Sequence, residues 1–266
     1  MFRCQKQLFS LVALRFHFGY HDNMEIKGKT ALVTGAAKRV GRVIALELAK
    51  NGCHVHLHYR ASKSEAEATA VEIRSRGVDC HLFQADLGKN FDILNIAAAV
   101  FKKNLAVDFL INNASLFYKT PLDSVSEADW DKLVDTNLKG PFFLSKEIGK
   151  KMAEGLGGKI INIADWSGFR PYKDYAPYCA SKGGLITLTK SLARDLAPKV
   201  FANAIAPGPV LLPPDFSEAE KEAITKKTVL GRIGTPEDIA HAVIFLLEND
   251  FINGTVLVVD GGRSLV

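Results

Sequence analysis

The sequence is poor in cysteine. Its 266 residues contain four, Cys4, Cys53, Cys80 and Cys179, which lie far apart and form no Cys-x-x-Cys pair. Disulfide frameworks and structural zinc sites both depend on closely spaced cysteines. The sequence therefore indicates neither, and isolated thiols fit a protein of the reducing cytoplasm.

Long apolar runs and charge of a single sign are missing as well. No segment approaches the roughly 18 consecutive apolar residues that a membrane-spanning helix requires. The formal net charge is +5, but the 34 Lys and Arg residues are scattered among 29 Asp and Glu residues. A surface for nucleic acid needs basic residues gathered on one face. We therefore expect a globular protein that contacts neither membrane nor nucleic acid.

Residues 1–23 lack the features of a complete targeting peptide. They hold Arg3, Lys6 and a short apolar run that ends at Arg15, and no small-residue cleavage motif follows. We interpret them as an extension or a misassigned start outside the fold, with a targeting segment as the alternative. Residues 24–266 are then expected to form one domain.

The remainder alternates short apolar runs with amphipathic patterns. Strands are predicted over 30–35, 53–59, 78–85, 107–114, 159–164, 200–207 and 255–262, and helices over 41–52, 64–76, 90–103, 127–154, 175–197 and 236–247. This order predicts an α/β protein, a single-domain Rossmann fold with a doubly wound parallel sheet of about seven strands and helices on both faces.

Three histidines recur at every second position of the strand expected over 53–59. His54, His56 and His58 would project from one face of that strand. A row of imidazoles can hold a metal, but no other ligand type stands close in the sequence. Packing or hydrogen bonding under a helix is the favoured interpretation, and we predict no metal site.

The first strand runs into TGAAKRVG, residues 34–41, and then directly into a helix. A tight turn at a helix N-terminus offers free N–H groups and the positive end of a dipole, which suit a pyrophosphate. The position after the first strand of a βαβ unit makes this a dinucleotide loop. It would bind through Gly35, Lys38, Arg39, Val40 and Gly41.

The second strand ends without the acidic residue that binds the ribose hydroxyls of NAD. The chain reads HYRASKS there, and the first acid is Glu65. Arg60, with the hydroxyl of Ser62 or Ser64, could bind a 2′-phosphate by charge-assisted hydrogen bonds, whereas a carboxylate would repel it. Tyr59 is expected to be a further cofactor-binding residue. The sequence therefore predicts NADP(H) as the cofactor.

Tyr178 and Lys182 stand four residues apart in a predicted helix, hence on one face. A free tyrosine has a pKa of about 10, and a neighbouring ammonium is expected to lower it by stabilising the phenolate. The pair is a plausible general acid for a group that receives a hydride.

Several motifs now coincide in order: TGAAKRVG (34–41), AD (85–86), NNAS (112–115), TNLKG (136–140), YCASK (178–182), APGPV (206–210) and VVDGG (258–262). With them the chain resembles the short-chain dehydrogenase/reductase family over about residues 27–266. The resemblance implies a Rossmann fold, a nicotinamide cofactor, a small-molecule substrate and a homotetramer.

The resemblance also implies residue roles. Asn137 would hold a water that links Lys182 to solvent. The cofactor would be contacted at the adenine by Asp86 and Leu87, at the NNAS motif by Asn113, Ala114 and Ser115, and on the nicotinamide side by Pro207, Gly208 and Val210.

Three positions depart from the ordinary family pattern. Arg39 and Ser115 stand where glycines are expected, and Asp165 stands where the catalytic serine is expected. Together with Phe117 they resemble the pteridine reductase branch, which includes dihydromonapterin and dihydrofolate reductases. Arg39 and Phe117 would then bracket the pterin, and Ser115 would touch the cofactor phosphate and the substrate.

The carboxylate at position 165 suits such a substrate chemically. An ionised aspartate donates no hydrogen bond and would repel a growing alkoxide, but it can accept from the amino and N–H groups of a pterin. Asp165 could also hold Tyr178 in place. In the alternative interpretation Asp165 is a helix cap or loop acid and Ser167 takes the serine role.

Residues 211–230 are expected to form a substrate lid, with an apolar wall at Leu212, Pro213 and Pro214 and a helix over 217–227. A variable surface loop is the alternative. The sequence as a whole predicts an NADPH-dependent reductase of a pterin or dihydrofolate-like ring. The alternatives are a carbonyl reductase acting on a 3-oxoacyl thioester, ketosteroid or sugar, and a dinucleotide-binding sensor without catalysis.

Overall fold

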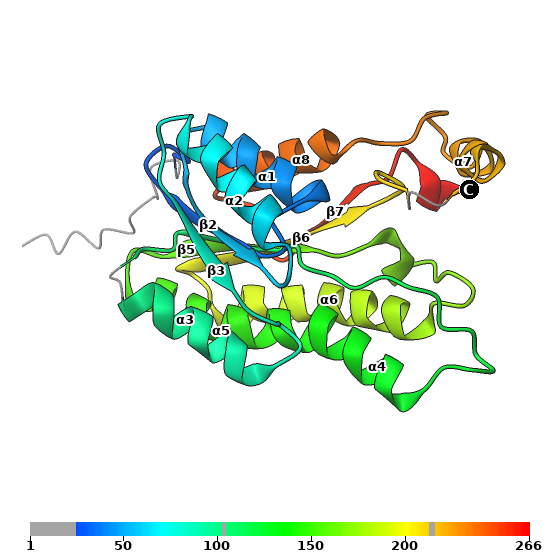
Figure 1. Ribbon diagram of the computed structural model, residues 1–266, viewed down its shortest axis with the longest axis horizontal. Coiled ribbons are helices and arrows are strands. Elements are labelled where there is room, and N and C mark those ends of the chain that lie inside the picture. The colour runs from blue at the N-terminus through cyan, green and yellow to red at the C-terminus, as the bar shows by residue number, and fades with distance from the viewer. Residues whose placement is uncertain (1–24, 103–104, 213–215) are drawn as a thin grey trace, which may run out of the picture.

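The computed structural model describes residues 25–102, 105–212 and 216–266. They form one α/β domain around a parallel sheet of seven strands in the order β3-β2-β1-β4-β5-β6-β7 (Figure 1). The strands are β1 (Thr30–Val33), β2 (His54–Tyr59), β3 (Cys80–Gln84), β4 (Phe109–Asn112), β5 (Gly158–Ile163), β6 (Val200–Pro207) and β7 (Val256–Val259). The predicted Rossmann fold is confirmed. The extension expected over 1–23 lies outside the described residues.

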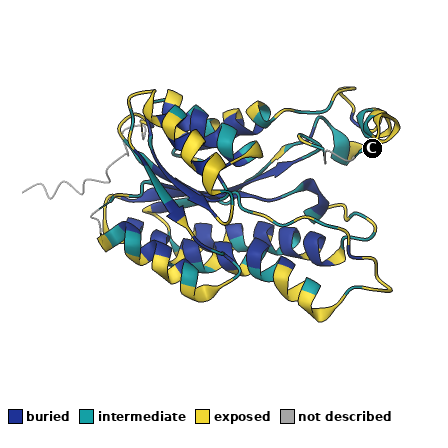
Figure 2. Ribbon diagram, in the orientation of Figure 1, coloured by how far each residue is buried: buried dark blue, intermediate teal, exposed yellow. Residues whose placement is uncertain are grey.

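Two helical layers cover the sheet (Figure 1). One holds α1 (Arg39–Lys50), α2 (Lys63–Arg74) and α8 (Pro236–Glu248), and the other holds α3 (Asn90–Lys102), α4 (Glu127–Val134), α5 (Gly140–Glu154) and α6 (Ala176–Asp195). The strands carry near-continuous apolar runs because both faces of the sheet are covered. The buried residues accordingly lie between sheet and helices (Figure 2).

The single helix predicted over 127–154 is wrong. The chain forms α4 and α5, joined by a π-helical turn, η1 (Asp135–Lys139). Pro141 has no N–H to donate to the carbonyl of Asn137, so a continuous α-helix would lose a bond there. The N–H of Gly140 instead bonds the carbonyl of Asp135. Such π turns often occur at functional sites.

The carboxyl ends of the strands meet at one edge of the sheet. β1 and β4 are neighbours there although the chain visits β2 and β3 between them. Parallel α/β sheets bind ligands outside the carboxyl ends of their strands, at such a switch in strand order. The helix α7 (Glu218–Thr225) lies near the same edge, close to the C-terminus (Figure 1). Among the described helices, none has both the length and the apolar character needed to span a bilayer.

Candidate active site

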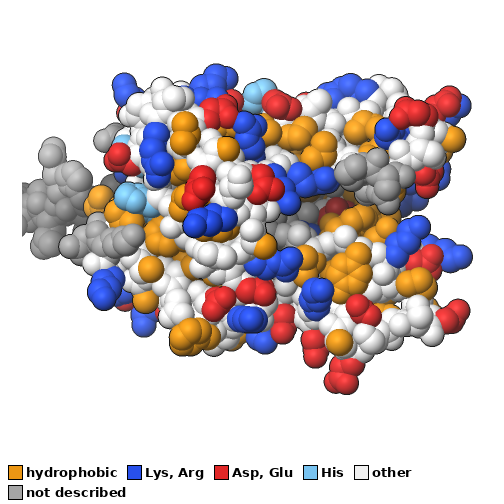
Figure 3. All heavy atoms as spheres, in the orientation of Figure 1, with side chains coloured by type: hydrophobic (Ala, Val, Ile, Leu, Met, Phe, Trp, Pro, Cys, Tyr) orange, Lys and Arg blue, Asp and Glu red, His pale blue; other side chains and the backbone are white. Residues whose placement is uncertain are grey.

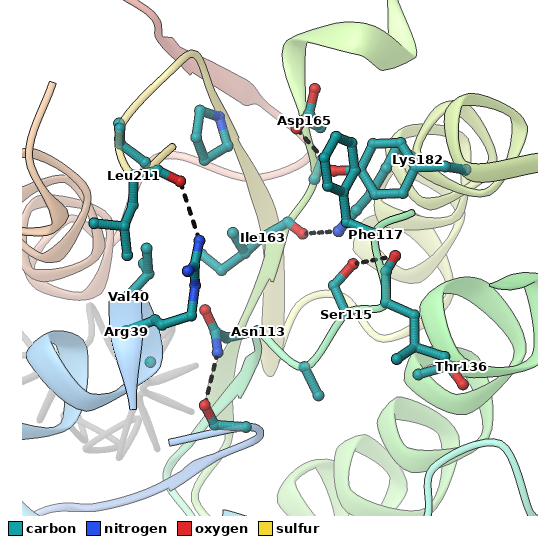
Figure 4. A pocket seen from close by; sticks show the side chains of 18 of the residues that line it. Arg39, Val40, Asn113, Ser115, Phe117, Thr136, Ile163, Asp165, Lys182 and Leu211 are labelled. Atoms are coloured by element: carbon teal, nitrogen blue, oxygen red, sulfur yellow. Dashed lines mark hydrogen bonds between the residues drawn. The ribbon is translucent and has the colours of Figure 1, made fainter. Parts of the chain in front are cut away.

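A cavity of about 830 Å³ opens at this edge of the sheet. Its walls include all but one of the predicted site residues: Gly35, Lys38, Arg39, Val40, Gly41, Tyr59, Arg60, Ser62, Asp86, Leu87, Asn113, Ala114, Ser115, Phe117, Asp165, Tyr178, Lys182, Pro207, Gly208 and Val210. Figure 4 shows Arg39 and Asn113 on one side of this pocket and Asp165, Phe117 and Lys182 on the other. The exception is Asn137.

The loop between β1 and α1 is held close to the strand edge. Gly35 has a φ of +63°, which favours glycine. The side-chain amide of Asn113 donates to the carbonyls of Thr34 (2.9 Å) and Gly35 (3.3 Å). A Cβ at Gly41 would overlap this amide and the carbonyl of Gly35. One side of the loop therefore packs against Asn113, and its other side is left free to bind a ligand.

The start of α1 fits an anion. Its first turn holds no acidic residue, and the side chain of Lys38, the N-cap, makes no capping hydrogen bond. The first N–H groups of a helix lack intrahelical partners and suit a phosphate. At the end of β2, Arg60 is exposed and lines the pocket, and no carboxylate among the described residues pairs with it. The residues present thus fit the predicted phosphates of NADP(H).

His58 ties this loop to the end of β3. Its Nδ1 accepts a hydrogen bond from the N–H of Gly35 (3.0 Å), and its Nε2 lies 3.1 Å from the carbonyl oxygen of Ala85. Burial lowers the pKa of His58 to about 4, so the ring is neutral and donates from Nε2. Sequence analysis expected packing or hydrogen bonding for His58 but did not identify its partners, because neither of them is near it in sequence.

The other two histidines of the row are placed differently. His54 Nδ1 accepts from the N–H of Asp79 (2.9 Å). His56 is buried, and neither of its ring nitrogens has a hydrogen-bond partner among the described residues. Within that part of the chain, no three His, Cys, Asp or Glu side chains are grouped as metal ligands would be.

The carboxylate of Asp165 accepts two hydrogen bonds, one at each oxygen. Its Oδ1 accepts from the N–H of Ser167 (2.7 Å) and so caps the short 3-10 helix η2 (Trp166–Gly168). Its Oδ2 accepts from the hydroxyl of Tyr178 (2.8 Å). The interpretation as a cap and the interpretation as a partner of Tyr178 therefore both hold. Ser167 is fully buried and does not line the pocket.

The expected lowering of the Tyr178 pKa is wrong. Burial, followed by the charge and hydrogen bond of Asp165, raises the pKa of Tyr178 well above its usual value. The ammonium of Lys182 donates to the carbonyl of Ile163 (2.8 Å), and its Nζ lies 5.8 Å from the centre of the Tyr178 ring. Burial also lowers the pKa of Lys182 to about 8, against the opposing charge of Asp165. At neutral pH Tyr178 is thus a protonated donor.

Asn137 lies in η1 and is fully buried. Its side-chain oxygen accepts from the N–H of Leu116 (2.8 Å), and its amide nitrogen donates to the carbonyl of Leu116 (2.9 Å) and to Ser181 Oγ (3.3 Å). The side chain thus fixes the segment after β4 that carries Ser115 and Phe117. Its predicted part in a proton path to Lys182 stays a prediction.

Aromatic side chains form one wall of the pocket. The ring of Phe117 stacks on Tyr175, with centroids 4.6 Å apart at 11°, and meets Tyr178 edge-on at 4.8 Å. Tyr172 contacts both Phe117 and Trp166 edge-on. Sequence analysis missed Trp166, Tyr172 and Tyr175 as lining residues, although all three stand within fourteen residues of Tyr178. The wall offers flat surfaces to a planar ring.

Arg39 joins the loop to the segment after β6. It has a φ of 55°, rare for a residue with a side chain, and its guanidinium donates to the carbonyl of Leu211 (3.0 Å; Figure 4). The predicted bracketing of a substrate between Arg39 and Phe117 is untested, but both side chains line the same pocket.

The expected lid borders the pocket through Phe216, Ile224 and Lys227. The helix expected over 217–227 is present as α7, with a capping box between Ser217 and Glu220. Of the expected apolar wall, Leu212 lines the pocket, and Pro213 and Pro214 lie outside the described residues.

Comparisons with known proteins extend over nearly the whole chain. A family model described as enoyl-(acyl carrier protein) reductase matches residues 35–264. The 3-oxoacyl-(acyl-carrier-protein) reductase of Staphylococcus epidermidis is 36% identical over 242 residues, which cover 89% of this chain and 99% of the relative.

Two solved structures have the same fold. A candidate gluconate dehydrogenase from Agrobacterium tumefaciens has a TM-score of 0.86 and 30% identity, over 92% of this chain and 99% of its own. A blue fluorescent protein from a metagenomic library, in complex with NADPH, has a TM-score of 0.84 and 31% identity, over 90% of this chain and 99% of its own. The names of these relatives favour the alternative of a carbonyl reductase, and none belongs to the pteridine reductase branch.

Proposed function

Since the chain belongs to the short-chain dehydrogenase/reductase family, we propose that it is an NADPH-dependent reductase of a carbon–nitrogen double bond in a flat, nitrogen-rich ring such as a pterin. The observation that carries the proposal is the hydrogen bond from Tyr178 to Asp165. A second candidate, a 3-oxoacyl thioester, is supported by the name of the Staphylococcus relative.

The cofactor is NADP(H), which supplies or accepts the hydride. The loop around Gly35 and the start of α1 would bind its pyrophosphate, and Arg60 with Ser62 would bind the 2′-phosphate. Asp86 and Leu87 would contact the adenine, and Pro207, Gly208 and Val210 the nicotinamide; that all five line one pocket supports these assignments.

Tyr178 supplies the proton. Because its phenol is neutral, it can donate to the ring nitrogen next to the carbon that is reduced. The phenolate that remains is stabilised by the ammonium of Lys182 in the same buried corner. Asn137 keeps the segment between Ser115 and Phe117 in position and takes part in proton resupply.

Asp165 decides which group is reduced. A ketone oxygen about to become an alkoxide needs hydrogen-bond donors on both sides, as an oxyanion hole provides. Here one side is a carboxylate, which accepts and does not donate. A pterin would offer an amino or N–H donor to Asp165 Oδ2 in place of the Tyr178 hydroxyl, which would then donate to a ring nitrogen. Phe117 and Arg39 bracket the ring, and Ser115 contacts it from the NNAS turn.

The assay is NADPH oxidation by the full chain with dihydrobiopterin, dihydrofolate and acetoacetyl-N-acetylcysteamine. We expect turnover of at least one dihydropterin and a lower kcat/KM for the thioester. The variant Ser167→Ala should retain activity, because its hydroxyl lies outside the pocket. Turnover of the thioester alone supports the second candidate. NADPH binding without any turnover would instead support a sensor.

We further propose, from the family resemblance, that the protein is a cytoplasmic homotetramer and that residues 1–23 contribute nothing to the fold. Light scattering on the full chain and on residues 24–266 measures the number of subunits, which should be four, and thermal unfolding of both measures the contribution of residues 1–23 to stability. The expected result is the same number of subunits and the same melting temperature for the two.

A further inference from the structure

The turn after β7 contacts the loop that carries Asp165 at two points. The guanidinium of Arg263 lies over the ring of Trp166, with its Cζ 4.6 Å from the ring centre, and Trp166 directly follows Asp165. Farther along that loop, the guanidinium of Arg170 donates to the main-chain carbonyl of Ser264 (3.0 Å). Two segments that are distant in the sequence are thus joined at the start of η2 and again just after its end.

The turn that carries Arg263 is itself held by hydrogen bonds. The carboxylate of Asp260 accepts from the N–H groups of Gly262 (2.9 Å) and Ser264 (2.7 Å). The Nη1 of Arg263 donates to the main-chain oxygen of Val266 (3.2 Å), which orients the guanidinium. The cation therefore extends toward the indole from a fixed support.

The same turn packs on the loop after β6. A Cβ at Gly208 would lie 2.6 Å from the Cα of Asp260, and the N–H of Gly208 donates to the carbonyl of Val259 (2.9 Å). Gly208 is one of the residues predicted to contact the nicotinamide. Arg263 also lines the pocket, and Figure 3 shows a hollow in this half of the molecule with hydrophobic and basic side chains at its edge. The turn therefore links the predicted nicotinamide side of the pocket to the loop of Asp165.

The orientation of Asp165 depends on contacts from outside its own loop. Asp165 is the N-cap of η2, which is a single turn of three residues, and short 3-10 helices have poor hydrogen-bond geometry. The buried ring of Trp166 contacts Arg263 on its face and Tyr172 edge-on, with ring centroids 5.3 Å apart. A shift of Trp166 would tilt η2 and move the carboxylate away from the hydroxyl of Tyr178.

We propose that Arg263 is a positioning residue, which fixes the carboxylate of Asp165 in the pocket by holding Trp166. This inference rests on the proposed function, in which Asp165 selects the group that is reduced, and it assigns one further residue to that selection. A partly buried cation over an indole can shift a local equilibrium by about tenfold, which is about 1.4 kcal/mol. Without the cation, the productive orientation of Asp165 is populated correspondingly less.

The first test uses the full chain with NADPH and dihydrobiopterin. Arg263→Gln removes the cation, and we expect kcat/KM to fall about tenfold. Arg263→Lys keeps a cation over Trp166 and should recover most of that loss. Arg194→Gln makes the same chemical change at an exposed arginine of α6 outside the pocket and should leave kcat/KM unchanged. Thermal unfolding confirms that each variant is folded.

A double-mutant cycle shows whether Arg263 acts through Asp165. In the Asp165→Ser protein no carboxylate is left to position, so adding Arg263→Gln should change kcat/KM by less than about twofold. A further tenfold fall in that protein would indicate that Arg263 contacts the substrate directly or that the structure is generally impaired, and either result overturns the inference. An unchanged kcat/KM in Arg263→Gln alone overturns it as well.

The fluorescence of Trp166 separates this inference from the proposed function. In a Trp130→Phe protein Trp166 is the only tryptophan, and its quenching by acrylamide should rise with Arg263→Gln and much less with Arg263→Lys. Reduction of the thioester alone refutes the proposed function, and the cycle is then read with the thioester, where the effect of Arg263→Gln should again vanish in Asp165→Ser. If neither substrate is reduced, the quenching decides. Quenching that Arg263→Gln leaves unchanged overturns the inference in every case.

Discussion

His58 and His56 lie two residues apart on one strand and provide a matched pair of substitutions. Both imidazoles are buried, and burial is the main cause that lowers both pKa values to about 4. The difference lies in their partners: His58 bonds Gly35 and faces the carbonyl of Ala85, whereas His56 has no hydrogen-bond partner among the described residues. Replacing each with Phe keeps an aromatic ring and removes the polar atoms, and the steric cost of the larger phenyl ring is common to both buried sites.

The expected cost follows from the groups left unpaired. His58→Phe leaves one N–H and one carbonyl without a partner, at about 1–3 kcal/mol each, so we expect a loss of about 2–6 kcal/mol in the free energy of unfolding. His56→Phe removes ring nitrogens that have no hydrogen-bond partner within the geometric limits among the described residues, so it should cost clearly less than His58→Phe. Because Gly35 belongs to the dinucleotide loop, His58→Phe should also weaken NADPH binding by about tenfold, which is about 1.4 kcal/mol.

Urea denaturation and fluorescence titration with NADPH measure the two quantities. The reasoning is refuted if His58→Phe changes neither, or if His56→Phe costs as much as His58→Phe. A loss of stability with unchanged NADPH affinity would show that His58 stabilises the fold but does not influence NADPH binding by the loop.

Three further predictions concern the cofactor and the proton donor. Arg39→Gly removes a residue held at positive φ, so the free energy of unfolding should rise by about 1 kcal/mol while kcat/KM for a dihydropterin falls; a fall in both would contradict the account. Arg60→Asp should reverse the preference from NADPH to NADH in steady-state assays, because a carboxylate repels the 2′-phosphate, and an unchanged preference would count against Arg60. Since Lys182 has a pKa of about 8 in the folded protein, its charge is lost as the pH rises through that value, and kcat should decline above it. A kcat that stays constant up to pH 10 would contradict a role for the Lys182 ammonium in catalysis.

The fold could be predicted from the sequence because the two patterns that indicate it, apolar runs and helical periodicity, are local. These patterns indicated the alternation of strands and helices, and hence a doubly wound parallel sheet, and the loop at 34–41 could be placed from its neighbours. The break between α4 and α5 was missed because a π turn changes the helical register by one residue while the apolar pattern continues. Pro141 was the visible sign of it.

The sequence predicted which residues line the site better than it predicted their protonation states and their contacts. The lining residues follow from strand ends that meet at one edge, so nearly all predicted residues line one pocket. The direction of the Tyr178 pKa was wrong because burial and the contact with Asp165 arise only in three dimensions. Likewise, the partners of His58 and the approach of Arg263 to Trp166 join segments that are distant in sequence.

The central claim is that the carboxylate of Asp165 selects a carbon–nitrogen double bond over a carbonyl. The measurement is the ratio of kcat/KM for dihydrobiopterin to that for acetoacetyl-N-acetylcysteamine, with NADPH, in the wild-type protein and in Asp165→Ser. The account predicts a ratio above one in the wild type and a fall of at least about tenfold, or 1.4 kcal/mol, when serine restores a donor. A wild-type protein that prefers the thioester, or a ratio unchanged by the substitution, would contradict it.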